Sequence, residues 1–198
     1  MDDYQLIAER FQGTIESIAM SVDTLAAPIS QASELMTQTL LRDGKIVTCG
    51  NGVDSAQAQL FAASLLCALE QERPALPALH IGSDSASLTA IAAESSSEIY
   101  ARQLRGLGQD GDALLLVSSG EAGPALAGAV AAAHDRNMRV IALSNTTDTS
   151  LPGLLLDSDE LLLVEARVRS QTIELQTMVL LCFCQLIEHK LFGGYTQG

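Results

Sequence analysis

The chain has 198 residues, of which 47% are hydrophobic and 4% aromatic, and its formal net charge is −13. This length and composition favour a single domain with an aliphatic core. Eleven Lys and Arg residues are too few to neutralise a phosphate backbone, which excludes a direct nucleic-acid binder. The sequence has no run of 18 apolar residues and no apolar leader. We therefore expect a cytoplasmic protein without a membrane span or a secretory signal.

Apolar residues recur at helical spacing over 3–26 and again over 29–41, with Pro28 between the two predicted helices. We expect this N-terminal segment, residues 1–43, to pack in an oligomer, and residues 44–198 to form the main domain. Buried strands are predicted at 45–49, 78–81, 113–117, 139–143 and 160–164. Because helices alternate with these strands, the pattern predicts an α/β fold, a three-layer αβα sandwich around a five-stranded parallel sheet.

Small polar residues follow three of the predicted strands. The carboxyl ends of parallel strands meet at one edge of a sheet, where ligands bind. The first loop runs into a predicted helix, so its backbone N–H groups form a cradle for an anion. The predicted ligand-binding residues are Gly50, Asn51, Gly52, Asp54, Ser118, Ser119, Ser144 and Asn145.

The last predicted helix, residues 171–191, is apolar on every side over 178–184. A helix of this kind must be covered all round. One sheet face cannot do this, so we expect the N-terminal helices and further copies of the chain to cover it.

The sequence resembles the SIS, or sugar isomerase, domain family in Cys-Gly-Asn-Gly at 49–52, Gly-Asp-Ala-Leu-Leu-Leu-Val-Ser-Ser at 111–119 and Val-Ile-Ala-Leu-Ser at 140–144. More narrowly, residues 61–64, 72–78 and 104–108 look like the phosphoheptose isomerase branch and its relatives, the DnaA initiator-associating proteins. The resemblance covers essentially the whole chain. It implies a flavodoxin-like sheet and a homotetramer.

The catalytic residues of the isomerases do not carry over to this sequence. Where the resemblance implies a metal-binding His and a catalytic Glu, this chain has Leu60 and Ser64. Where it implies a Gln and a His on the final helix, this chain has Ile173 and Leu181. None of these side chains can bind zinc or act as an acid or base at neutral pH. We therefore predict no catalytic residue of the family type, no metal ligand and no cofactor.

Two further positions of the final helix stay open. Glu174 matches a Glu that the family usually has, and it is interpreted either as a surviving general base or as a carboxylate that stabilises the start of the helix. Gln176 falls where relatives often carry a His. It is either a remnant of the site or a residue that hydrogen-bonds within the bundle of helices expected to pack around this one.

The phosphate loops are also altered relative to the family. Asp54 stands where the isomerases have Ser, and Glu121 adds a second carboxylate to the next loop. Each carboxylate costs a bound dianion about 1–4 kcal/mol, whereas the helix N-terminus returns about 0.3–1 kcal/mol. A sugar phosphate is therefore expected to bind weakly. The structural alternative for Asp54 is a helix N-cap.

The C-terminal residues Leu191 and Phe192 precede a Gly-Gly stop. They are predicted either to contact a partner protein, as the resemblance to the initiator-associating proteins implies, or to make a hydrophobic contact at the helix end. A Ser-His-Asp hydrolase is not expected, because His80 lies in a predicted strand and no Gly-x-Ser-x-Gly motif is present.

These observations favour a non-catalytic SIS-domain protein of the initiator-associating type. It would be a homotetramer that bridges copies of a replication initiator or another protein, with a residual pocket for a carbohydrate derivative. The alternative is a phosphosugar isomerase of the phosphoheptose type that acts on sedoheptulose 7-phosphate. A third reading is a sugar-phosphate sensor.

Overall fold

The structure, a computed structural model, describes residues 2–69 and 72–193. Its helices are α1 (Asp3–Leu41), α2 (Val53–Cys67), α3 (Ser85–Glu94), α4 (Ala101–Leu107), α5 (Gly123–Asp135) and α6 (Arg169–Phe192), with short 3-10 turns at Ser96–Glu98 and Leu151–Gly153. Its strands are β1 (Ile46–Gly50), β2 (Ala78–His80), β3 (Ala113–Val117), β4 (Arg139–Asn145) and β5 (Glu160–Val164).

All five strands run parallel in the order β2-β1-β3-β4-β5, which confirms the predicted sheet. This is the flavodoxin-like order, and the direction of winding reverses between β1 and β3. Ligands of such sheets bind in the crevice at the carboxyl ends of the strands next to this reversal. The loops after β1 and β3 therefore lie where a binding site is expected.

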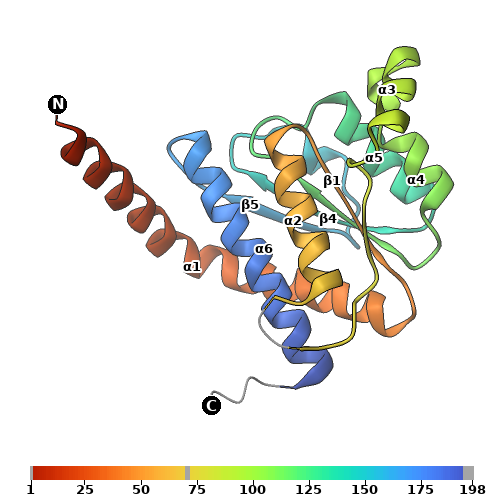
Figure 1. Cartoon of the computed structure of the whole chain (residues 1–198), viewed down its shortest axis with the longest axis horizontal. Coiled ribbons are helices and arrows are strands. Elements are labelled where there is room, and N and C mark those ends of the chain that lie inside the picture. The colour runs from red at the N-terminus through yellow and green to blue at the C-terminus, as the bar shows by residue number, and fades with distance from the viewer. Residues whose placement is uncertain (1, 70–71, 194–198) are drawn as a thin grey trace.

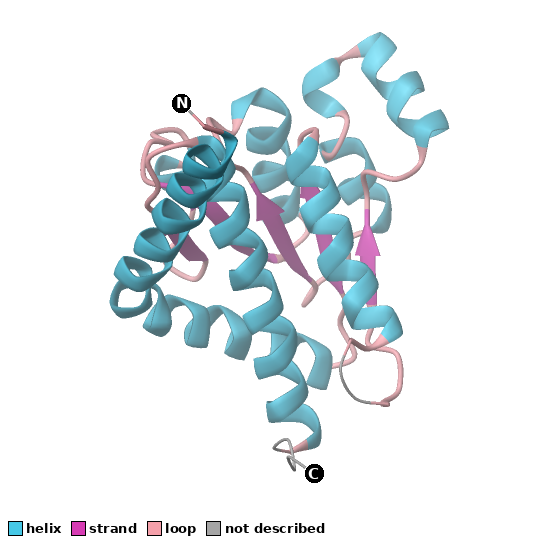
Figure 2. Cartoon of the chain, turned by 60° about the vertical axis from the view of Figure 1, so that its left-hand side comes forward, coloured by secondary structure: helices cyan, strands magenta, loops and turns pink. Residues whose placement is uncertain are grey.

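Helices cover both faces of the sheet, as Figures 1 and 2 show. Leu115 belongs to the apolar core under α1, α2 and α6, and its neighbour Leu114 belongs to the core under α4 and α5. Successive side chains of a strand point to opposite faces. A strand buried on both faces therefore reads as one continuous apolar run, as 113–117 does.

The N-terminal segment differs from the prediction of two helices. A single helix, α1, runs through Pro28 and changes direction along its length (Figures 1 and 2). Proline removes one helical hydrogen bond and bends a helix without always ending it. Leu25 and Met36 are buried, whereas Phe11, in the half that projects from the body, is 68% exposed. The domain boundary at residue 43 stays a prediction.

The last helix, α6, is covered on its inner side by α1, α2 and the sheet. Phe183 lies in the core and meets Phe61 of α2 edge to face, with ring centroids 6.2 Å apart. By length and composition α6 could cross a membrane, and it alone among the described helices meets that test. Half of its apolar window is buried inside the protein, so packing in the core accounts for its composition.

Candidate functional site

The turn after β1 is built for close approach of the backbone. A Cβ atom on Gly50 would lie 2.7 Å from the carbonyl group of Asp54 and 2.9 Å from the carbonyl oxygen of Val117. Gly52 has a φ of +57°, in the left-handed region that favours glycine, and it precedes the first turn of α2. These two glycines place the start of α2 directly over the ends of β1 and β3.

Asp54 does not cap α2, so the N-cap prediction is wrong. Gly52 occupies the N-cap position, and Asp54 lies in the first helical turn with only 3% of its surface exposed. Its carboxylate accepts hydrogen bonds from the backbone N–H of Ser119 at 3.0 Å and from Ser119 Oγ at 2.5 Å. Arg169 adds a charge contact at 3.7 Å, and its Nε donates to Ser119 Oγ at 2.8 Å. A carboxylate of the chain itself thus uses the backbone N–H and the hydroxyl of Ser119, a predicted ligand residue of the loop after β3.

The remaining predicted ligand residues converge at the same edge, but they hydrogen-bond within and between the loops themselves. Ser118 Oγ donates to the Gly120 carbonyl at 2.9 Å, and Asn145 Nδ2 donates to the same oxygen at 3.1 Å. Ser144 Oγ donates to Asp148 at 2.8 Å, and Asn51 Nδ2 donates to the Ala122 carbonyl at 3.4 Å. These bonds fix the loops relative to one another and use the side-chain donors that a phosphate would need.

Gln176 of α6 lies beneath these loops and is fully buried. Its Nε2 donates to the carbonyl of Ser118 at 2.8 Å and reaches that of Ser144 at 3.3 Å, so one amide joins the ends of β3 and β4. Among the described residues its Oε1 has no partner, and neither do the buried Oε1 atoms of Gln57 and Gln171. Buried acceptors are normally satisfied. A hydroxyl group of a ligand is a hydrogen-bond donor that could satisfy such an oxygen.

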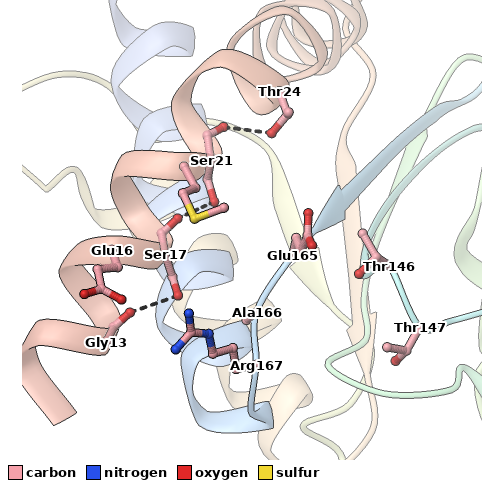
Figure 3. Close-up of a pocket in the computed structure, with 11 residues that line it drawn as sticks. Gly13, Glu16, Ser17, Ser21, Thr24, Thr146, Thr147, Glu165, Ala166 and Arg167 are labelled. Atoms are coloured by element: carbon pink, nitrogen blue, oxygen red, sulfur yellow. Dashed lines mark hydrogen bonds between the residues drawn. The ribbon is translucent and has the colours of Figure 1, made fainter. Parts of the chain in front are cut away.

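A polar cavity of about 390 Å³ opens beside this edge, between α1 and the ends of β4 and β5 (Figure 3). Glu16 reaches it from α1, and Glu165 and Arg167 reach it from the segment after β5. The other lining residues are Gly13, Ser17, Met20, Ser21, Thr24, Thr146, Thr147 and Ala166. The one guanidinium group can pair with a phosphate and the hydroxyls can hydrogen-bond to a polyol, whereas the two carboxylates would repel a bound dianion.

Sequence reasoning missed this cavity. Thr146 and Thr147 directly follow β4, and Glu165 to Arg167 directly follow β5, so strand ends were a usable signal. The lining residues of α1 are Gly13, Glu16, Ser17, Met20, Ser21 and Thr24, which recur at the spacing of one helix face. Their position opposite the sheet edge depends on how α1 crosses the body, and the sequence does not report that crossing.

The positions that the family resemblance assigns to catalysis offer no metal ligands. Leu60 is 43% exposed, and Ser64 donates its hydroxyl proton to the Leu60 carbonyl at 2.8 Å. The Ile173 carbonyl accepts from Gln57 Nε2 at 2.8 Å, and Leu181 is 39% exposed. These residues do not fit a zinc ion. No cluster of three His, Cys, Asp or Glu side chains that could hold a metal ion occurs within 2–69 and 72–193.

Glu174 joins α6 to α1. It forms an ion pair with Arg10 and accepts a hydrogen bond from Thr14 Oγ1 at 2.7 Å. Both contacts engage its carboxylate oxygens with the first helix. They favour a packing role for Glu174 over that of a free general base.

The C-terminal pair divides between two environments. Leu191 packs against the core, whereas Phe192 is 50% exposed and ends α6. Gly193 donates its N–H to the His189 carbonyl at 3.0 Å, and Gly194 of the predicted Gly-Gly stop lies outside the described residues. A partner contact at this pair stays a prediction.

Comparison with known proteins gives matches along nearly the whole chain. A family profile described as SIS domain matches residues 10–145. Phosphoheptose isomerase from Alkalilimnicola ehrlichii is 41% identical over 196 residues, which covers 98% of this chain and all of that protein. The phosphoheptose isomerase of Methylococcus capsulatus is 37% identical over 194 residues with the same coverage. A solved phosphoheptose isomerase from Francisella tularensis superposes with a TM-score of 0.91 at 31% identity, covering 96% of this chain and all of that one.

These comparisons correct the main functional expectation. The relatives that match over nearly their full length bear the name of an isomerase. The expectation of a non-catalytic protein of the initiator-associating type is therefore wrong, and the alternative is the reading that the relatives support. The expectation had rested on the four substituted side chains alone.

Proposed function

This chain belongs to the SIS domain family, in its phosphoheptose isomerase branch, and from that premise we propose that it is a phosphosugar isomerase. The observation that carries the proposal is 41% identity along the full length of a relative named phosphoheptose isomerase. The substrate class is a sugar phosphate such as sedoheptulose 7-phosphate. The protein would work without the family side chains that Leu60, Ser64, Ile173 and Leu181 replace, so its acid and base must lie elsewhere.

The cavity of Figure 3 supplies groups with suitable chemistry. Interconversion of an aldose and a ketose requires a base that removes a proton from carbon and an acid that protonates the neighbouring carbon or oxygen. Glu16 and Glu165 are two carboxylates that can serve in these roles. Arg167 can bind the phosphate through paired N–H donors. The hydroxyls of Thr146 and Thr147 can hydrogen-bond to the polyol.

The proposal includes assembly of the chain into a homotetramer in the cytoplasm. In support, the projecting half of α1 exposes the large apolar side chains Tyr4, Leu6, Ile7, Phe11, Ile15, Met20 and Val22. Exposed apolar patches of this extent mark surfaces that associate. The outer side of α6 adds Leu181, which is also partly exposed.

Isomerase activity is tested by incubating the purified chain with sedoheptulose 7-phosphate, with and without zinc, and following the aldoheptose phosphate by NMR. We expect turnover, a rise of about tenfold or more in KM for Arg167→Met, and a fall of about 100-fold in kcat for Glu165→Gln. Arg139→Met is the matched control, because Arg139 hydrogen-bonds to the Ser158 carbonyl away from the cavity.

Three results would count against this proposal. Absence of turnover in both conditions would refute the isomerase. Binding detected by thermal shift without turnover would point to a sugar-phosphate sensor instead. Equal effects of Arg167→Met and Arg139→Met would show that the phosphate does not bind in this cavity.

A further inference from the structure

A second polar group lies at the end of β2, the edge strand opposite to β5, and therefore far along the sheet from the cavity. His80, the last residue of β2, is only 8% exposed. Its Nε2 lies 2.9 Å from Ser55 Oγ, and its Nδ1 lies 3.0 Å from Thr48 Oγ1. Ser55 belongs to the first turns of α2, and Thr48 belongs to β1.

The hydrogen-bond network fixes the protons of this group. The Thr48 hydroxyl donates its one proton to the Ala58 carbonyl at 3.0 Å, so towards His80 it can only accept. The ring proton must then sit on Nδ1, which leaves the lone pair of Nε2 free. Ser55 Oγ consequently donates its hydroxyl proton to His80 Nε2.

The histidine is held in the form that can take up a proton. Burial lowers the pKa of His80, although a hydrogen bond from its ring to the backbone of Thr48 acts in the opposite direction. A neutral imidazole at neutral pH is a competent general base. A serine within hydrogen-bond reach of a base that a third group orients is the signature of an activated nucleophile.

Gly82 packs directly against the two reacting atoms. A Cβ atom at this position would lie 2.5 Å from His80 Nε2 and 2.7 Å from Ser55 Oγ. Any larger residue would therefore displace the pair or cover it. Ser55 itself is partly exposed.

We propose that Ser55 and His80 form a nucleophile–base pair that accepts acyl groups from small carboxylic esters without negative charge. Ser55 Oγ forms a bond to the acyl carbon while its proton passes to His80 Nε2. The ester C–O bond breaks, and the leaving alcohol takes that proton. Water then hydrolyses the acyl-serine by the same route. Negatively charged esters are disfavoured, because Asp54, the residue before Ser55, carries a carboxylate.

The test treats the full-length protein with p-nitrophenyl acetate, follows release of p-nitrophenol, and maps the acetyl group by peptide mass spectrometry. We expect the acetyl group on Ser55 and none in Ser55→Ala. His80→Gln should slow acylation by about 10²–10⁴-fold. Ser64 is the internal control, because it lies on the same helix and its hydroxyl donates to a backbone carbonyl. A fluorophosphonate, which loses fluoride and forms a stable adduct, detects the nucleophile if deacylation is fast.

The decisive measurement is the labelling of the unmodified protein, so the test does not depend on whether the variants fold. Absence of both adducts at Ser55 would overturn the proposal and leave His80 as a core residue satisfied by two hydroxyls. Equal rates for the unmodified protein and a folded His80→Gln variant, checked by circular dichroism, would do the same. Isomerase turnover of Ser55→Ala should be unchanged, so this result and that of the proposed function are separable.

Discussion

Replacement of Asp54 by Ser tests whether the Asp54 carboxylate occupies a position at which an anion would otherwise bind. The carboxylate of Asp54 holds the backbone N–H and the hydroxyl of Ser119, and it lies near Arg169. Asp54→Ser removes this carboxylate and releases those donors. The same change introduces a hydroxyl of the kind that the family resemblance implies here.

Two opposite effects of Asp54→Ser follow from the structure. Loss of hydrogen bonds to a buried charged group costs about 1.5–3 kcal/mol, which lowers Tm by about 3–12 °C for a chain of this size. Two unit charges about 4 Å apart repel by about 4 kcal/mol near a protein surface. Relief of a third of that repulsion, about 1.3 kcal/mol, corresponds to about tenfold tighter binding of inorganic phosphate, since about 1.4 kcal/mol is a factor of ten.

The assay is isothermal titration of inorganic phosphate at fixed protein concentration and low salt, together with thermal unfolding. Asp148→Asn is the matched control, because Asp148 is a buried carboxylate that holds Ser144 rather than Ser119. It should lower Tm without a gain in phosphate affinity. If Asp54→Ser binds phosphate no more tightly than the unmodified chain, the idea that Asp54 occupies an anion position is refuted.

Three other substitutions test the packing of the domain. Arg73→Met should lower the free energy of unfolding, measured in urea, by about 3–5 kcal/mol, because Arg73 Nε pairs with Glu188 at 2.6 Å and both side chains are buried. A decrease below about 1 kcal/mol would contradict this. Burial, with Cys49 and Asp54 nearby, raises the pKa of Tyr100 from 10.0 to about 12, so the unfolded chain ionises first and stability should fall between these pH values. Tyr100→Phe should flatten that part of the profile, and an unchanged slope would exclude Tyr100 as its source. Gly50→Ala should cost about 1–3 kcal/mol by overpacking against Asp54 and Val117, and an unchanged Tm would show that the turn can relax.

The sheet was predictable because burial on both faces leaves a simple signal. Residues 113–117 are apolar without interruption, and all five are buried between two helix layers. The loop residues were found for a related reason, since Ser118, Ser144 and their neighbours directly follow such strands. Their meeting at one edge follows from parallel topology alone.

The details of the site depended on tertiary contacts that the sequence does not report. Asp54 has the spacing of an N-cap, but its partner is Ser119 on another loop. Ser55 and His80 are separated by a helix and a connecting segment, and only the pairing of β2 with β1 brings them together. Pro28 bends α1 without ending it, because packing on α6 and β5 holds the helix after the bend.

The projecting half of α1 has a practical consequence for handling the protein. An isolated subunit would present aromatic and aliphatic side chains such as Tyr4 and Phe11 to water. Dilution that separates the subunits would therefore be expected to promote their adsorption to vessel walls and their aggregation. Working stocks should therefore be kept concentrated. Loss of protein on dilution would indicate that the exposed apolar side chains of the projecting half of α1 cause it.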